Sequence, residues 1–183
     1  MSQAKIPPQL LLPSMKYERI RNGSKGIVFR LSEKQAAKIL YEGDCWKDCE
    51  NFKIRDDNQA YSQLNHEYEL NCDLRDFEVQ TPRPMRLDEL VLFPHSQKRY
   101  PAFIMEFLPF PSGADLGFHE IGIAEKLAIN EIGKAVESGF IPGDDVRNSN
   151  NFLYNRKLKI IYLIDFGGWM LENKPESFDI ANL

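Results

Sequence analysis

The 183-residue sequence is short of cysteine, histidine and long apolar runs, and each shortage excludes a class of protein. No stretch approaches the roughly 20 apolar residues that span a bilayer. Prolines break the short apolar run within residues 1–13, which argues against a secretory signal. The three cysteines suit a reducing compartment, and a zinc site would need two ligands besides Cys45 and Cys49. We therefore expect a soluble, cytoplasmic protein that has no zinc site and does not associate with a membrane.

A strong charge of one sign is also absent, since the formal net charge is −4. A mildly acidic chain is not expected to bind nucleic acid, because contact with the phosphate backbone calls for a basic face. The basic residues between Arg83 and Arg99 fit a solvated surface. The chain is 43% hydrophobic, which is enough for one domain or for two small lobes around a shared cleft.

Turn residues and apolar periodicity divide the chain into short strands, two helices and connecting loops. Strands are predicted at residues 15–20, 27–31, 35–41, 85–93, 100–108, 152–154 and 160–165. Helices are predicted at 58–74 and 119–138, where apolar residues recur at helical spacing. Residues 43–57 are expected to form an irregular insertion. Residues 109–117, with two prolines and two glycines, are expected to link two lobes.

The last predicted strand ends in an acid, Asp165, followed by Phe166 and two glycines. Glycines let the backbone turn sharply, and a carboxylate at the mouth of a buried strand can hold a hard cation through its oxygens. Taken alone, this pattern is also that of an ordinary strand ending in a turn. The order of the features upstream changes its meaning.

Those features are a glycine turn between two strands, a lysine on the next strand, a glutamate in the following helix, and an Asp/Asn-rich loop before the final Asp-Phe-Gly. In this order they resemble the protein-kinase-like superfamily, from about residue 16 to residue 168. The resemblance implies an α+β, two-lobed fold. Residues 1–108 would form a lobe with a five-stranded antiparallel sheet and one helix, and residues 109–183 would form a reduced, mainly helical lobe.

The resemblance assigns the nucleotide site to several segments of the first lobe. Gly23, Ser24 and Gly26 match the loop over the phosphates, although Arg21 stands where its first glycine would be. Lys38 matches the strand lysine that binds the phosphates, and Glu67 matches its helix partner, with Glu69 as the rival. Met105, Glu106 and Leu108 match the interlobe hinge, whose backbone would hydrogen-bond adenine.

The loop at residues 138–153 matches the catalytic loop only in part, because Pro142 replaces the usual histidine. Asp144 is the favoured catalytic base, and Asp145 is the alternative. Asn151 and Asp165 would hold Mg²⁺ on ATP, while Asn150 would give the more usual spacing from the acid.

Fifteen residues follow Gly168, a brevity similar to minimal RIO-like kinases and to the small kinase of the threonylcarbamoyl-tRNA (KEOPS) machinery. We expect a partner protein or a second copy of the chain to cover the short second lobe. The predicted function is ATP- and Mg²⁺-dependent transfer of the γ-phosphate to a hydroxyl, as in an atypical serine/threonine kinase; the acceptor stays open. The alternatives are a pseudokinase that binds nucleotide or acts as a scaffold for a partner, and an unrelated α+β binding domain.

Overall fold

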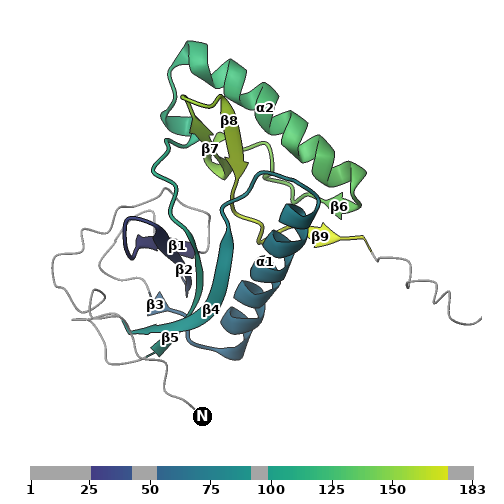
Figure 1. Ribbon diagram of the computed structural model, residues 1–183. Coiled ribbons are helices and arrows are strands. Elements are labelled where there is room, and N and C mark those ends of the chain that lie inside the picture. The colour runs from purple at the N-terminus through teal and green to yellow at the C-terminus, as the bar shows by residue number, and fades with distance from the viewer. Residues whose placement is uncertain (1–25, 43–52, 92–98, 173–183) are drawn as a thin grey trace, which may run out of the picture.

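The computed structural model describes residues 26–42, 53–91 and 99–172 (Figure 1). Its first half is built on an antiparallel sheet with the strand order β1-β2-β5-β4, in which β3 also pairs with β2. The strands are β1 (Gly26–Arg30), β2 (Gln35–Glu42), β3 (Lys53–Ile54), β4 (Pro84–Val91) and β5 (Arg99–Glu106).

The two faces of this sheet bury different sets of apolar residues, because side chains alternate along a strand. Ala37 and Ile39 of β2 pack on one face, and Leu40 packs on the other face against helix α1 (Asn58–Asp76). Lys38 falls by alternation on the same face as Leu40. The sequence Ala-Ala-Lys-Ile-Leu therefore turns a single lysine towards α1.

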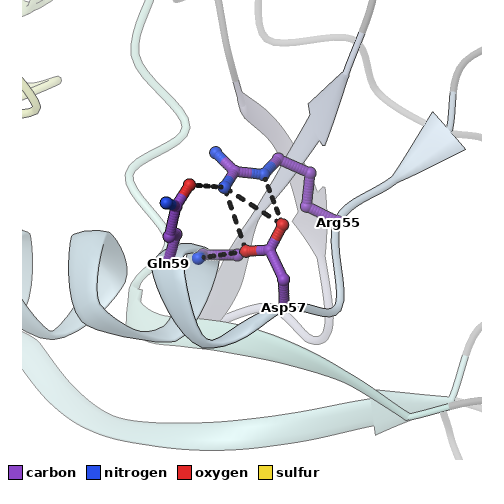
Figure 2. A network of polar contacts seen from close by, with 4 residues as sticks. Arg55, Asp57 and Gln59 are labelled. Atoms are coloured by element: carbon purple, nitrogen blue, oxygen red, sulfur yellow. Dashed lines mark hydrogen bonds and ion pairs between the residues drawn. The ribbon is translucent and has the colours of Figure 1, made fainter.

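Helix α1 begins at a polar cap that fixes its first turn. The Asp57 carboxylate accepts a hydrogen bond of 2.7 Å from the Ala60 backbone N–H. Arg55 donates to both Asp57 and Gln59, so that the cap is held from the strand side (Figure 2). The Ala60 N–H, followed by Arg55, keeps the pKa of Asp57 below its usual range. From this cap the helix buries residues at intervals of three and four: Ala60, Leu64, Glu67, Leu70, Asn71 and Leu74.

The second half of the chain contains helix α2 (Phe118–Glu137), which runs along the hairpin of β7 and β8 (Figure 1). The largest core cluster lies here and includes Ala124, Ala128, Phe152, Ile161 and Trp169. Short elements complete this half: η2 (Gly113–Asp115), β6 (Phe140–Ile141), η3 (Ser149–Asn151), β7 (Phe152–Asn155), β8 (Ile160–Leu163) and β9 (Met170–Leu171).

The two helices and the longer strands lie within about two residues of their predicted ends, including the last strand, which stops at Leu163. The predicted strand at 15–20, with Gly23 and Ser24, lies outside the described residues. Strands β3, β6 and β9 were not predicted, because two residues are too short to show a period. None of the helices in the described ranges is long and apolar enough to cross a membrane.

Candidate functional site

Three charged residues from distant parts of the chain meet at the centre of the molecule. The Lys38 Nζ lies 2.6 Å from Glu67 Oε2 and 2.7 Å from Asp165 Oδ1. Lys38 comes from β2, Glu67 from α1 and Asp165 from the segment after β8. The side chain of Glu67 is only 2% exposed, while that of Asp165 is 22% exposed and is the member of the cluster most open to solvent.

Local structure explains why each of these side chains points inward. Glu67 lies on the buried stripe of α1, between Leu64 and Leu70. Asp165 adopts a left-handed backbone conformation with φ 65°, which turns the chain sharply at the end of β8. The residue before it is held by a hydrogen bond from the Ile164 N–H to the Asn151 carbonyl. A left-handed non-glycine residue is uncommon, and such residues gather at functional sites.

The charged cluster has one cation for two carboxylates. Burial works against the charged form of Lys38, but the carboxylates of Glu67 and Asp165 outweigh it and raise the pKa of Lys38 above its ordinary value. Burial is also the largest cause that raises the pKa of Glu67, against the attraction of Lys38, and Asp165 adds to the rise. The two shifts have different leading causes, since the attraction of two carboxylates outweighs burial at Lys38, whereas burial outweighs the attraction of Lys38 at Glu67. Within the described chain, the buried Glu67 Oε1 has no hydrogen-bond partner.

A pocket opens beside this cluster, between the sheet and the β7–β8 hairpin. Its walls are largely apolar; we call the part lined by the buried Lys38 and Glu67 its inner end, and the part lined by the partly exposed Glu106 and Leu108 its rim. The lining residues of the first half are Gly26, Val28, Ala36, Lys38, Glu67, Asn71, Pro82, Phe103, Met105, Glu106, Phe107 and Leu108. Those of the second half are Asn150, Asn151, Leu153, Ile164, Asp165 and Phe166.

Most of the residues predicted for the site therefore line one pocket: Gly26, Lys38, Glu67, Met105, Glu106, Leu108, Asn151 and Asp165. Of the two glutamates weighed as the partner of Lys38, Glu67 makes the ion pair, and Glu69 instead accepts a hydrogen bond from the Asn65 amide. The two candidate bases, Asp144 and Asp145, are exposed and do not line the pocket.

The loop that carries these two acids is nevertheless fixed against the site. The Asn151 Nδ2 donates to the Asp145 carbonyl at 2.9 Å. The backbones of Gly143 and Gly168 pack closely, since a Cβ on Gly143 would lie 3.0 Å from the Gly168 carbonyl oxygen. Glycine at position 143 thus lets the acidic loop approach the segment after Asp165.

At the rim of the pocket, the backbone after β5 has groups that the sheet does not use. The Glu106 N–H donates to the Arg83 carbonyl, and the Phe107 N–H donates to the Lys34 carbonyl. The Arg83 N–H donates to the Glu106 side chain at 3.2 Å. The Leu108 N–H has no acceptor among the described residues.

Sequence reasoning missed two polar residues of α1 near the pocket. Asn71 is 1% exposed, lines the pocket and accepts a hydrogen bond of 2.6 Å from the Thr81 hydroxyl. His66, next to Glu67, contacts the carbonyl of Trp169 at 2.9 Å. Asn71 lies one helical turn beyond Glu67, so its position on the buried face was available from spacing alone.

Together these features define a mixed α/β fold with a multi-strand antiparallel sheet and two helices, compatible with a kinase-like fold. The crystal structure of monomeric WbdD matches 80% of this chain and 33% of that chain, with a TM-score of 0.51 and 14% identity. A 2.2 Å crystal structure of WbdD matches 82% of this chain and 32% of that chain, with a TM-score of 0.46 and 17% identity. WbdD is a bifunctional kinase–methyltransferase.

At this identity the likeness shows the fold alone, and the chain spans about a third of the WbdD structures. No family model matches the chain, and no curated protein matches it by sequence.

Proposed function

We propose that this protein is an ATP- and Mg²⁺-dependent phosphotransferase of atypical kinase type, which transfers the γ-phosphate of ATP to a hydroxyl. Residues 1–108 and 109–183 are its two lobes, with the nucleotide between them. The observation that carries the proposal is the meeting of Lys38, Glu67 and Asp165 at the inner end of one pocket.

The outer part of the pocket suits a purine base. Val28, Ala36, Met105 and Leu153 line it with apolar surface, as a flat aromatic ring requires. At the rim, the free N–H of Leu108 is a donor for a ring nitrogen of adenine. The Arg83 N–H donates to the Glu106 side chain and not to the Glu106 backbone carbonyl. That carbonyl could therefore accept a hydrogen bond from the exocyclic amine of adenine.

The inner part of the pocket suits phosphates and a hard cation. Lys38 offers an ammonium for the phosphate oxygens, and Asp165 offers a carboxylate that solvent can reach. Since the Asn151 Nδ2 is used by the Asp145 carbonyl, the Asn151 Oδ1 is the atom left for a cation. Carboxylate and amide oxygens are ligands that Mg²⁺ accepts, so the residues present fit the ion. Bound there, Mg²⁺ would neutralise charge on the transferring phosphoryl group.

A hydroxyl acceptor needs a base in line with the phosphate, and positioning is most of what a kinase contributes. Asp144 and Asp145 are the candidates. Asp144 remains the favoured base and Asp145 the alternative, and the hydrogen bond from Asn151 to the Asp145 carbonyl ties this pair of acids to the proposed metal site. Both carboxylates are exposed, so the acceptor would complete this part of the site.

A pseudokinase is the second candidate function. It is favoured by Pro142 in place of the usual histidine and by the two acids that lie outside the pocket lining. In this alternative the protein binds nucleotide, or acts as a scaffold for a partner, without transferring phosphate.

A thermal-shift titration with ATP, with and without Mg²⁺, tests both candidates. A ligand at about 100 times its dissociation constant adds ~2.7 kcal/mol of stability. A Mg²⁺-dependent shift together with ATP turnover supports the kinase, and the shift without turnover supports the pseudokinase. Lys38→Met and Asp165→Ala are each expected to abolish turnover in a folded protein. No shift under any condition would overturn both the kinase and the nucleotide-binding pseudokinase, and would leave only a scaffold that binds no nucleotide.

A further inference from the structure

His66 makes a contact that joins the two halves of the molecule. Its Nε2 lies 2.9 Å from the carbonyl oxygen of Trp169, a residue 103 positions away, and the contact is partly buried. A carbonyl oxygen only accepts, so His66 must carry a proton on Nε2. Both the neutral Nε2–H tautomer and the charged imidazolium meet that requirement. The contact therefore depends on a side chain long enough to place an N–H donor at this carbonyl.

The acceptor belongs to a rigid turn that also carries Asp165. Trp169 is 3% exposed, and its ring packs edge-to-face on Phe166 with a centroid distance of 5.4 Å. The Trp169 N–H donates to the Phe166 carbonyl at 3.0 Å. The Trp169 carbonyl is therefore joined through these contacts to the turn of residues 165–168, and the contact with His66 links α1 to that turn.

The donor lies next to Glu67 on α1, and the same segment approaches Glu67 closely. A Cβ on Gly167 would lie 3.0 Å from Glu67 Oε1. Gly167 thus sets how near α1 can come to the segment, and His66 sets how far it can move away. Between these two contacts, the carboxylates of Glu67 and Asp165 share the ammonium of Lys38.

We propose that His66 is a positioning residue, which fixes the spacing between Glu67 and Asp165 around Lys38. This inference rests on the proposed function for its consequence in ligand binding. His66 fixes the segment that carries Asp165, the carboxylate of the proposed metal site, so the Mg²⁺-dependent part of ATP binding should depend on His66. The part that ATP retains without Mg²⁺ uses Lys38 and the pocket walls but not Asp165 as a metal ligand, and should depend on His66 less.

Four single substitutions test the positioning role of His66, and each changes one property of the wild-type protein. His66→Leu removes the donor, and His66→Gln keeps an N–H donor at similar reach. Gly167→Ala disturbs the same spacing from the opposite side by adding a Cβ against Glu67. His119→Leu is the matched control, because His119 is exposed on the first turn of α2, and the ring contact found for it is with its neighbour Phe118.

Isothermal titration of each variant with ATP is then compared in Mg²⁺ and in EDTA. His66→Leu and Gly167→Ala are expected to weaken ATP binding about fivefold in Mg²⁺, the size expected for one lost hydrogen bond, and to weaken it clearly less in EDTA. His66→Gln should restore most of the affinity, and His119→Leu should match the wild type. Equal losses with and without Mg²⁺, or no loss in Mg²⁺, would overturn the positioning role.

A second arm needs no nucleotide and separates this inference from the proposed function. If His66 supports the charged cluster, the losses in Tm caused by His66→Leu and by Lys38→Met should not add in the double variant, which should lose less than their sum. Additive losses would contradict the inference even if ATP binds. Non-additive losses in a protein that does not bind ATP would contradict the proposed function and leave the positioning of the cluster standing.

Discussion

Replacing Lys38 by methionine tests the charged cluster most directly. Methionine keeps an unbranched side chain of similar length but removes the cation, so the carboxylates of Glu67 and Asp165 are left facing one another. Removing one partner of a buried ion pair costs about 3–5 kcal/mol, because a charge stays buried without compensation. Asp165 is 22% exposed and can regain water, which favours the lower end of that range.

A loss of about 3 kcal/mol corresponds to a fall in Tm of roughly 6–12 °C for a chain of this length. Typical domains have about 5–15 kcal/mol of stability, so the variant should still fold. Urea unfolding followed by circular dichroism measures the loss. Adding Glu67→Gln to Lys38→Met removes one of the two facing charges and should recover part of the stability.

The pH dependence of stability gives a second test of the Lys38→Met variant, because the direction of the change can be predicted. Burial raises the pKa of Glu67, so its protonated form favours the folded state. Stability from this group is complete below the ordinary glutamate pKa and is lost as the pH rises through the raised pKa. Without Lys38 the pKa of Glu67 should rise further, and the deficit of Lys38→Met should shrink towards about pH 4. The double variant with Glu67→Gln should lack that pH dependence. A Lys38→Met protein as stable as the wild type at pH 7, or a double variant less stable than Lys38→Met, would refute this account.

Two further predictions concern packing around the site. Gly113→Ala should destabilise the protein by about 1–3 kcal/mol, because its Cβ would lie 2.6 Å from the Ser149 carbonyl and against the ring of Phe152; Gly122→Ala, inside α2, where a Cβ meets nothing within 4 Å, is the control that should not destabilise in the same thermal melt. Asn71→Leu should cost about 1–3 kcal/mol in urea unfolding, because it leaves the buried Thr81 hydroxyl without its acceptor, and adding Thr81→Val should recover most of that loss.

The main elements could be predicted from the sequence because they follow from periodicity, whereas Lys38, Glu67 and Asp165 were singled out by the order of motifs in the family resemblance. In the structure, alternation along β2 turns Lys38 to the face that α1 covers, and Glu67 lies on the buried side of α1. The glycines after Asp165 marked a sharp turn at the end of a buried strand. These patterns extend over several residues, so one unusual position does not erase them.

Other features depend on contacts that no local pattern records. The choice between Glu67 and Glu69, two positions apart, depends on which side of α1 is buried, and Glu67 shares the buried side with Leu64 and Leu70. The loop around Asp145 is held by a hydrogen bond from Asn151 and by the approach of two glycine backbones. The His66 ring contacts the backbone carbonyl of Trp169, 103 residues away. Every residue has a backbone carbonyl, so the sequence does not indicate which one His66 contacts.

The charge balance of the cluster connects the proposed ligands to each other. Lys38 holds the Asp165 oxygen that a cation in the proposed site would also use, while the second carboxylate, Glu67, keeps one oxygen without a partner in the described chain. A phosphate that draws the Lys38 ammonium would release Asp165 for a metal ion, and a metal ion that takes Asp165 would release Lys38 for phosphate. Each ligand would therefore favour the other by the same free energy, as linkage requires. In the proposed function, Lys38 would occupy the Asp165 carboxylate until nucleotide and metal bind together.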